Sequence, residues 1–289
     1  MIDQPGIYTM PGDEYHADPC IEPSLSASLA AVLVGTTPLH AWARHPRLNE
    51  HFERVEEEKF DIGNLAHSIV LEGNADKLHL VDAKDWRTKA AQEERDQARA
   101  DGKIPLLEKD FERVRVAGEA IRIQLMARDD DPPIFSDGKA EQTLIWQERG
   151  IWIRARLDWL RDDYLAIDDL KTTARSANPL VWGNKTAFNI GADIQVALYR
   201  RGVKALTGID PFFRYVIAES VPPFAIGVVS LGASALELGE AKVERAIELW
   251  RRCTRDNNWP GYPTGVYMAD APAWAELQWM EQDAEVVLS

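Results

Sequence analysis

The chain has 289 residues, of which 45% are hydrophobic and 28% are charged, so it is long enough to bury a core as one large domain or at most two. No stretch reaches the roughly 20 apolar residues of a membrane helix, and the N-terminus lacks the basic-then-apolar order of a signal peptide. Its two cysteines, Cys20 and Cys253, exclude a disulfide framework and a four-cysteine metal cluster. We therefore expect a cytoplasmic protein that does not contact a membrane.

The net charge of −14 argues at first against a nucleic-acid partner. Its distribution weakens that argument, because the stretch from Arg154 to Lys204 holds nine Lys/Arg and six Asp, a sum of +3, which leaves −17 for the remainder. DNA would then bind to a local basic lining within an acidic body, an arrangement that limits indiscriminate phosphate binding. On charge alone, an acidic protein without a nucleic-acid partner is the simpler interpretation.

The first half of the chain predicts helices. Residues 1–23 are rich in Pro, Gly and Asp and are expected to be irregular. Residues 84–105 form a polar insertion, most of which predicts a solvated helix or a mobile excursion. Helical runs or helical spacing of apolar residues are found at 24–34, 38–44, 60–71 and 108–127.

The second half predicts strands, followed by strands mixed with helices. Strand-like segments lie at 142–147, 151–160, 164–171, 212–218 and 224–231, and helical spacing recurs at 191–206 and 234–256. We therefore predict a single α/β domain over residues 1–289, with a mixed central β-sheet flanked by α-helices.

The segment RLDWLRDDYLAIDDLKT at 156–172 carries the strongest chemical signal. If the hairpin turn is centred between residues 162 and 163, or between 163 and 164, Asp158 and Asp169 lie on one face, either directly opposite or diagonal. Lys171 is two residues beyond Asp169 and shares that face. A shift of one residue in register would separate the three side chains.

Two close carboxylates repel one another unless a cation or a proton lies between them. Mg²⁺ takes oxygen ligands and often only one or two protein carboxylates, and such an ion can activate water for phosphodiester hydrolysis. A neighbouring Lys can orient or help to deprotonate that water, or stabilise the developing charge. The bare D-x-K pattern is, however, more often an exposed hairpin with a salt bridge.

Several further segments accompany this pattern in a fixed order. They are GNLAHSIVLE at 63–72, EQTLIW from Glu141, RLD ending at Asp158, DLK at 169–171, QVALY at 195–199 and DNNWPGY at 256–262. Together they resemble the PD-(D/E)xK nuclease superfamily, and specifically its RecE-type branch (exonuclease VIII), which is related to the RecB nuclease domain and lambda exonuclease. The resemblance covers residues 24–275 and implies a restriction-endonuclease-like core.

The resemblance also implies roles for individual residues. The implied metal ligands are His67, Asp158, Asp169 and the Leu170 carbonyl. The implied catalytic residues are Asp158, Asp169, Lys171, Glu141, Gln195 and Tyr199. Each has a plainer interpretation: a lone His on an apolar helix is more often a core residue, and Tyr199 would pack on the sheet. Arg154, Arg156, Arg175 and Lys185 are candidates for DNA phosphate contacts, although each is more simply a surface charge.

We therefore expect Mg²⁺-dependent hydrolysis of linear double-stranded DNA, with Mn²⁺ as an alternative ion. By resemblance, the polarity is 5′ to 3′, the setting is phage or prophage recombination beside a RecT-like single-strand annealing protein, and the chain is a homo-oligomer. A Cas4-like or endonucleolytic enzyme and a catalytically inactive DNA-binding protein remain as alternatives. With only two cysteines, the chain lacks the iron–sulfur cluster of some Cas4-type relatives.

Overall fold

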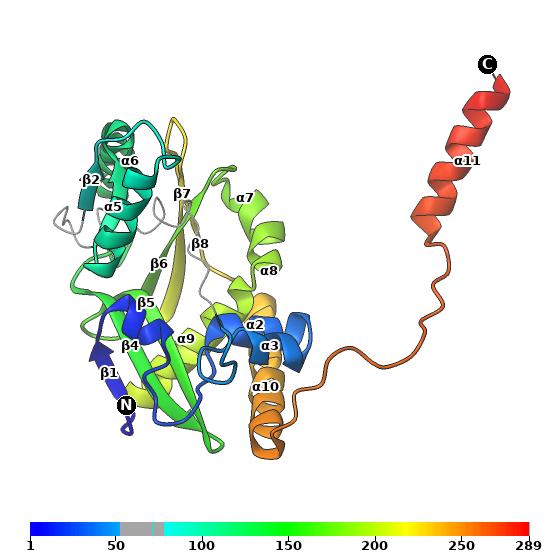
Figure 1. Ribbon diagram of the computed structural model, residues 1–289, viewed down its shortest axis with the longest axis horizontal. Helices are drawn as coiled ribbons and strands as arrows, with labels where there is room; N and C mark the ends of the chain where they lie inside the picture. The colour runs from blue at the N-terminus through cyan, green and yellow to red at the C-terminus, as the bar shows by residue number, and fades with distance from the viewer. Residues whose placement is uncertain (53–70, 72–77, 289) are drawn as a thin grey trace.

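The computed structural model describes residues 1–52, 71 and 78–288, and its centre is a six-stranded sheet with the order β1-β4-β5-β6-β7-β8 (Figure 1). The strands of this sheet are β1 (Gly6–Thr9), β4 (Gly138–Glu148), β5 (Ile151–Arg161), β6 (Ala166–Thr173), β7 (Phe212–Glu219) and β8 (Ile226–Val229). Every neighbouring pair is antiparallel except β6 and β7. The mixed sheet flanked by helices is the predicted restriction-endonuclease-like arrangement.

The described helices are α1 (Gly12–His16), α2 (Ala27–Gly35), α3 (Pro38–Ala43), α5 (Lys89–Ala100), α6 (Glu108–Met126), α7 (Pro179–Val181), α8 (Ala187–Asn189), α9 (Ala192–Thr207), α10 (Ala233–Asp256) and α11 (Ala273–Leu288). Helices α2, α9 and α10 lie over one face of the six-stranded sheet and α6 over the other. A π-helical turn, Trp182–Thr186, joins α7 to α8. None of the described helices combines the length and apolar character needed to cross a bilayer.

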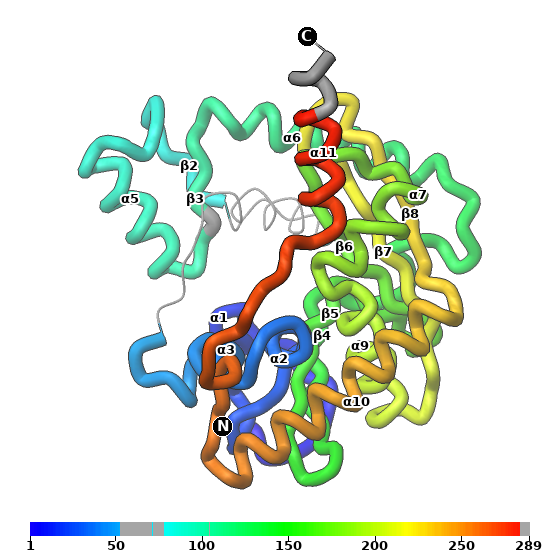
Figure 2. The backbone as a smooth tube through the Cα atoms, turned by 90° about the vertical axis from the view of Figure 1, so that its right-hand side faces the viewer, coloured from blue at the N-terminus to red at the C-terminus, as the bar shows by residue number. Residues whose placement is uncertain are grey.

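The main core lies between the sheet and helices α2, α9 and α10 (Figure 2). Trp146 from β4 and Trp250 from α10 are both fully buried in it. A second hydrophobic cluster lies between the sheet and α6, where Ile121 of α6 packs against Leu170 and Val216 of the sheet. Strand β6 contributes Ile167 to the first core and Leu170 to the second, so the sheet is covered on both faces at this strand.

The N-terminal segment is more regular than the sequence predicted. Residues 6–9 form β1, which pairs with β4 from Gly6↔Ile145 to Thr9↔Gln142, and a short helix follows. The strand has only four residues beside Pro and Gly, so its alternation is too short to stand out from an irregular segment. This pairing covers the outer edge of β4.

The polar insertion contains the expected solvated helix as α5, in which Ala91 and Ala98 are buried. Its last residues differ from expectation, because residues 104–107 form β3, which pairs in parallel with β2 (Leu78–Val81) as a separate two-stranded sheet. Helix α11 was not expected either, and it stands away from the body at the end of a long connection (Figure 1).

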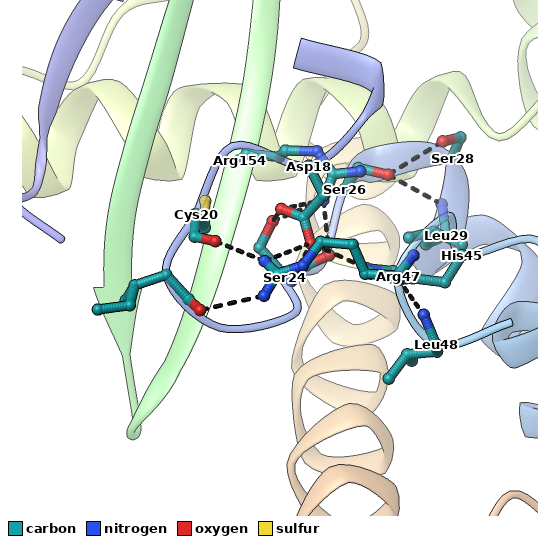
Figure 3. A network of polar contacts seen from close by, with 11 residues as sticks. Asp18, Cys20, Ser24, Ser26, Ser28, Leu29, His45, Arg47, Leu48 and Arg154 are labelled. Carbon is teal, nitrogen blue, oxygen red and sulfur yellow. Dashed lines mark hydrogen bonds and ion pairs between the residues drawn. The ribbon is translucent and has the colours of Figure 1, made fainter. Parts of the chain in front are cut away.

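A buried polar network fixes the segment after β1 to the sheet and to the chain after α3 (Figure 3). Asp18 accepts a hydrogen bond of 2.6 Å from the Ser24 hydroxyl and lies 3.1 Å from Nη1 of Arg154 on β5. Nε2 of His45 lies 3.1 Å from the same carboxylate. Asp18 and His45 are fully buried, and the Asp18 charge is balanced inside the protein by Arg154.

The protonation state of His45 follows from its partners. Its Nδ1 accepts the backbone N–H groups of Arg47 and Leu48 at 3.1 and 3.2 Å, so the ring's proton is on Nε2, which faces Asp18. Burial lowers the pKa of His45 below its ordinary value, although Asp18 opposes this shift. For Asp18, burial acts to raise the pKa, but hydrogen bonds from His45 and Ser24 and the charge of Arg154 outweigh it and lower the pKa.

These shifts predict a loss of stability in mild acid. Below its ordinary pKa of about 6.5, His45 takes up a proton in the unfolded chain but not in the fold, so the free energy of unfolding falls as the pH drops, by up to about 1.4 kcal/mol per pH unit. Asp18 contributes only below its ordinary pKa of about 3.9, outside this window. Asn at position 45 can still accept the two N–H groups but cannot titrate. Urea unfolding between pH 8 and pH 5 should therefore show a smaller pH dependence in His45→Asn than in the wild type, and equal slopes would contradict this assignment.

Candidate active site

The hairpin of β5 and β6 brings the two predicted carboxylates together. The structure pairs Trp159 with Asp168 and Leu160 with Ile167, and one further step of this register sets Asp158 opposite Asp169. The hairpin is therefore centred between residues 163 and 164, one of the two centres that the sequence allowed. Tyr164 has a φ of +61° in this turn.

Both carboxylates are held by groups of the fold. The Asp169 side chain is only 1% exposed, and its Oδ2 accepts a hydrogen bond of 2.8 Å from the Gln195 amide. Its Oδ1 contacts the Lys171 ammonium. Oδ2 of Asp158 accepts the backbone N–H of Leu170 at 2.7 Å. The carboxylates, the amide and the ammonium therefore meet on the face of the sheet that carries α9.

The charge on Lys171 is set by this environment. Burial alone would lower its pKa, but the Asp169 and Asp158 carboxylates and the hydrogen bond to Asp169 outweigh burial, so the pKa lies above its ordinary value. In the described state Lys171 is therefore an ammonium ion at neutral pH. It occupies the place of a counter-ion beside Asp169, which reduces the repulsion between the two carboxylates.

Helix α9 delivers the Q-x-x-x-Y pair to the site. Its N-cap is Gly191 at φ +73°, a left-handed conformation that glycine adopts without strain. Gln195 reaches Asp169 from the first turns of this helix. Tyr199 is buried beside Phe213, with ring centroids 6.2 Å apart. Burial raises the pKa of Tyr199 well above its ordinary value, and neighbouring negative groups that include Asp169 add to the shift, so the phenol is neutral.

Glu141 lies next to Asp158 in the sheet, but its carboxylate contacts Arg156. Its neighbours Ala140 and Gln142 pair with Trp159 and Leu157, which sets Glu141 opposite Asp158. Its φ of +58° interrupts β4, and its carboxylate accepts a hydrogen bond of 2.5 Å from Nε of Arg156. Glu141 is therefore at the border of the site with its charge balanced by Arg156.

The four basic candidates occupy different environments. Arg154 is only 4% exposed and bonds Ser24 and Asp18, so it serves the buried network and is left out of the proposed DNA contacts. Arg156 also donates to the Met10 carbonyl at 2.8 Å. Arg175 and Lys185 are exposed, the first just beyond the end of β6 and the second in the π-helical turn.

One residue of the site carried no signal in the sequence. Tyr215 is the partner of Asp169 in the parallel β6–β7 register and is fully buried. Its hydroxyl donates to the Ala192 carbonyl at 2.7 Å, and the Lys171 Nζ lies over its ring at 5.7 Å from the centroid. In the sequence FFRYVIAE it is one apolar residue among others, and only the crossover from β6 through α9 to β7 reveals its position.

The residues present fit a divalent ion with oxygen ligands. Asp158 and Asp169 converge, and the buried Oδ1 of Asp169 already contacts a cation. Among the residues that the structure describes, no third Asp, Glu, His or Cys completes a larger metal-binding group. Two carboxylates suffice for Mg²⁺, which usually keeps several waters. The predicted ligand His67 lies outside the described residues, and the Leu170 carbonyl stays a prediction.

Comparisons with known proteins agree with this fold. A family described as a "PDDEXK-like domain of unknown function (DUF3799)" matches residues 32–269. A crystal structure of a "putative exonuclease" from Eubacterium rectale superposes with a TM-score of 0.61 at 16% identity, over 94% of this chain and 98% of that one. The structure of SSO0001, at 11% identity over 66% of this chain and 85% of its own, reaches a TM-score of only 0.26. No curated protein matches the sequence.

Binding of a divalent ion between the carboxylates should stabilise the fold. An ion present at 100 times its Kd adds about 2.7 kcal/mol to the free energy of unfolding, which corresponds to roughly 4–5 °C in Tm for a chain of this size. We expect Mn²⁺ or Mg²⁺ to raise the Tm of the wild type by this amount in thermal melts. Asp158→Asn and Asp169→Asn should lose the increase, whereas Asp162→Asn, in the exposed turn of the same hairpin, should keep it. An increase that survives in Asp169→Asn would place the ion elsewhere.

Proposed function

The chain belongs to the family of PDDEXK-like domains, and from this premise we propose that it is a metal-dependent DNA nuclease with its active site at Asp158, Asp169 and Lys171. The observation that carries the proposal is the convergence of two carboxylates and one ammonium on a single face of β5 and β6. DNA binding alone does not require paired carboxylates, because their charge repels phosphate. Paired carboxylates that hold a divalent cation can instead promote hydrolysis of a phosphodiester, because the cation activates water and neutralises charge on the phosphate.

The residues of the site divide the chemistry among them. A divalent ion held by Asp158 and Asp169 would activate water and neutralise charge on the phosphate. Gln195 fixes the orientation of Asp169 through its amide, and the Leu170 N–H does the same for Asp158. Lys171, as a cation, stabilises negative charge that develops on the phosphate and orients the attacking water.

The proposed substrate rests on the resemblance to RecE-type nucleases. We propose linear double-stranded DNA, entered at an end and degraded 5′ to 3′. The exposed Arg175 and Lys185 are the proposed phosphate contacts. Arg156 lies at the border of the active site, where it forms a hydrogen bond with Glu141. The crystal structure that this chain resembles is described as an exonuclease, and this supports an end-dependent reaction. Tyr199, as a buried neutral phenol, has a positioning role in the proposal.

The proposed setting is recombination of the phage or prophage type. In it the chain works as a homo-oligomer beside a RecT-like single-strand annealing protein, with Mg²⁺ as the ion and Mn²⁺ as a substitute. This setting rests on the likeness to RecE-type sequences and not on the geometry of the site.

Digestion of matched DNA substrates tests the proposal. With Mg²⁺, the wild type should release nucleotides from a linear duplex labelled at one 5′ end and leave a covalently closed circle intact. EDTA should abolish the release. Asp169→Ala should lose at least about 1,000-fold in rate, because it removes a ligand of the ion that activates the water, while Asp162→Asn should retain the wild-type rate.

The alternatives give different results in the same assay. Cleavage of the closed circle would indicate an endonuclease. Binding of the duplex with no metal-dependent release by the wild type would indicate an inactive DNA-binding protein. Equal rates for Asp169→Ala and the wild type would exclude the proposed site.

A further inference from the structure

We propose that Tyr215 is a positioning residue whose ring holds the Lys171 ammonium beside the active site when a divalent ion takes the place of that ammonium on Asp169. The inference rests on the proposed function, because it assumes that Asp169 binds the ion. It assigns a task to a residue that lies outside the D-x-K and Q-x-x-x-Y motifs.

Tyr215 is fixed on several sides. It lies next to Asp169 in the parallel register of β6 and β7 and is fully buried. Its hydroxyl donates to the Ala192 carbonyl at 2.7 Å and lies 3.4 Å from Oε1 of Gln195. Its ring packs against Phe213, with centroids 4.8 Å apart. A ring so constrained is a rigid surface, and the Lys171 Nζ lies 5.7 Å from its centroid.

The described state shows why Lys171 needs a second partner. The ammonium contacts Oδ1 of Asp169, the carboxylate that would bind the ion. Ammonium and metal ion therefore compete for one carboxylate, and the ammonium must give up part of that contact when the ion binds. The Lys171 side chain is only 28% exposed, so water replaces the lost contact incompletely. An aromatic face attracts a cation and does not compete for the metal ion.

The neighbouring aromatic residue provides a matched comparison. Phe213 is on the same strand and the same face as Tyr215, and both are buried in the main core. Within the described residues, the aromatic ring found beneath the Lys171 ammonium is that of Tyr215. Replacing either ring by Leu leaves a similar space in the core, but only replacement of Tyr215 removes the surface under Lys171. Tyr215→Phe keeps the ring and removes the hydroxyl.

Titration calorimetry with Mn²⁺ in the absence of DNA is the test, supported by urea unfolding to confirm that each variant is folded. Tyr215→Leu should weaken Mn²⁺ binding about 3- to 30-fold, the range that corresponds to the loss of one partly buried cation–π contact. Tyr215→Phe should bind Mn²⁺ within about threefold of the wild type, and Phe213→Leu should do the same. With Lys171→Met as the background, Tyr215→Leu should have no further effect, because the cation that it holds is absent.

The outcomes separate the inference from the function on which it rests. Equal weakening by Tyr215→Leu and Phe213→Leu, or the same effect of Tyr215→Leu in the Lys171→Met background, would overturn the role of Tyr215 and leave the nuclease proposal standing. Absence of Mn²⁺ binding and of DNA hydrolysis in the wild type would overturn both. If Mn²⁺ binds as expected, kcat for duplex DNA should fall in Tyr215→Leu at unchanged KM and be restored in Tyr215→Phe.

Discussion

The structure depends on one electrostatic constraint, which is that two carboxylates from neighbouring strands face each other in a largely buried position. At about 4–6 Å, two such charges raise one another's pKa or require a cation between them. Around Asp158 and Asp169 the fold supplies an ammonium from Lys171, an amide from Gln195 and a backbone N–H from Leu170. The strands and helices around the site hold these groups in place.

The support comes from elements far apart in the sequence. The β5–β6 hairpin sets the register of the two carboxylates, and the crossover through α9 returns the chain to β7. On the opposite face of the sheet, Arg214 forms two hydrogen bonds, of 2.6 and 3.0 Å, with the buried Asp168. Consecutive acidic residues thus have different tasks, because Asp168 joins two strands within the core and Asp169 faces the site. Removal of one partner of a buried ion pair lowers the free energy of unfolding by about 3–5 kcal/mol. The role of Asp168 is therefore to stabilise the fold.

The sequence predicted those parts of the site that depend on local spacing. The turn residues 161–163 and the period of two along β6 were enough to place Asp158, Asp169 and Lys171 on one face. The spacing of four residues was enough to place Gln195 and Tyr199 on one side of a helix. These relations are set by backbone geometry and do not depend on distant contacts.

The parts that the sequence did not predict depend on contacts between distant residues. Tyr215 joins the site only because β7 lies parallel to β6. Arg154 resembled a surface charge, and its burial follows from Asp18 and Ser24, some 130 residues earlier. The sequence predicted a strand that begins at residue 142, yet β4 begins at Gly138 and contains Glu141 with a φ of +58°. No local pattern encodes such a reversal in a non-glycine residue.

Diffraction from crystals soaked in Mn²⁺, measured at the manganese absorption edge, would show whether Asp158 and Asp169 hold a divalent ion. We expect an anomalous peak roughly 2.0–2.3 Å from one oxygen each of Asp158 and Asp169, with the Lys171 ammonium moved off Asp169 and still over the ring of Tyr215. Density without such a peak, and with Lys171 still bound to Asp169 at saturating Mn²⁺, would contradict this expectation.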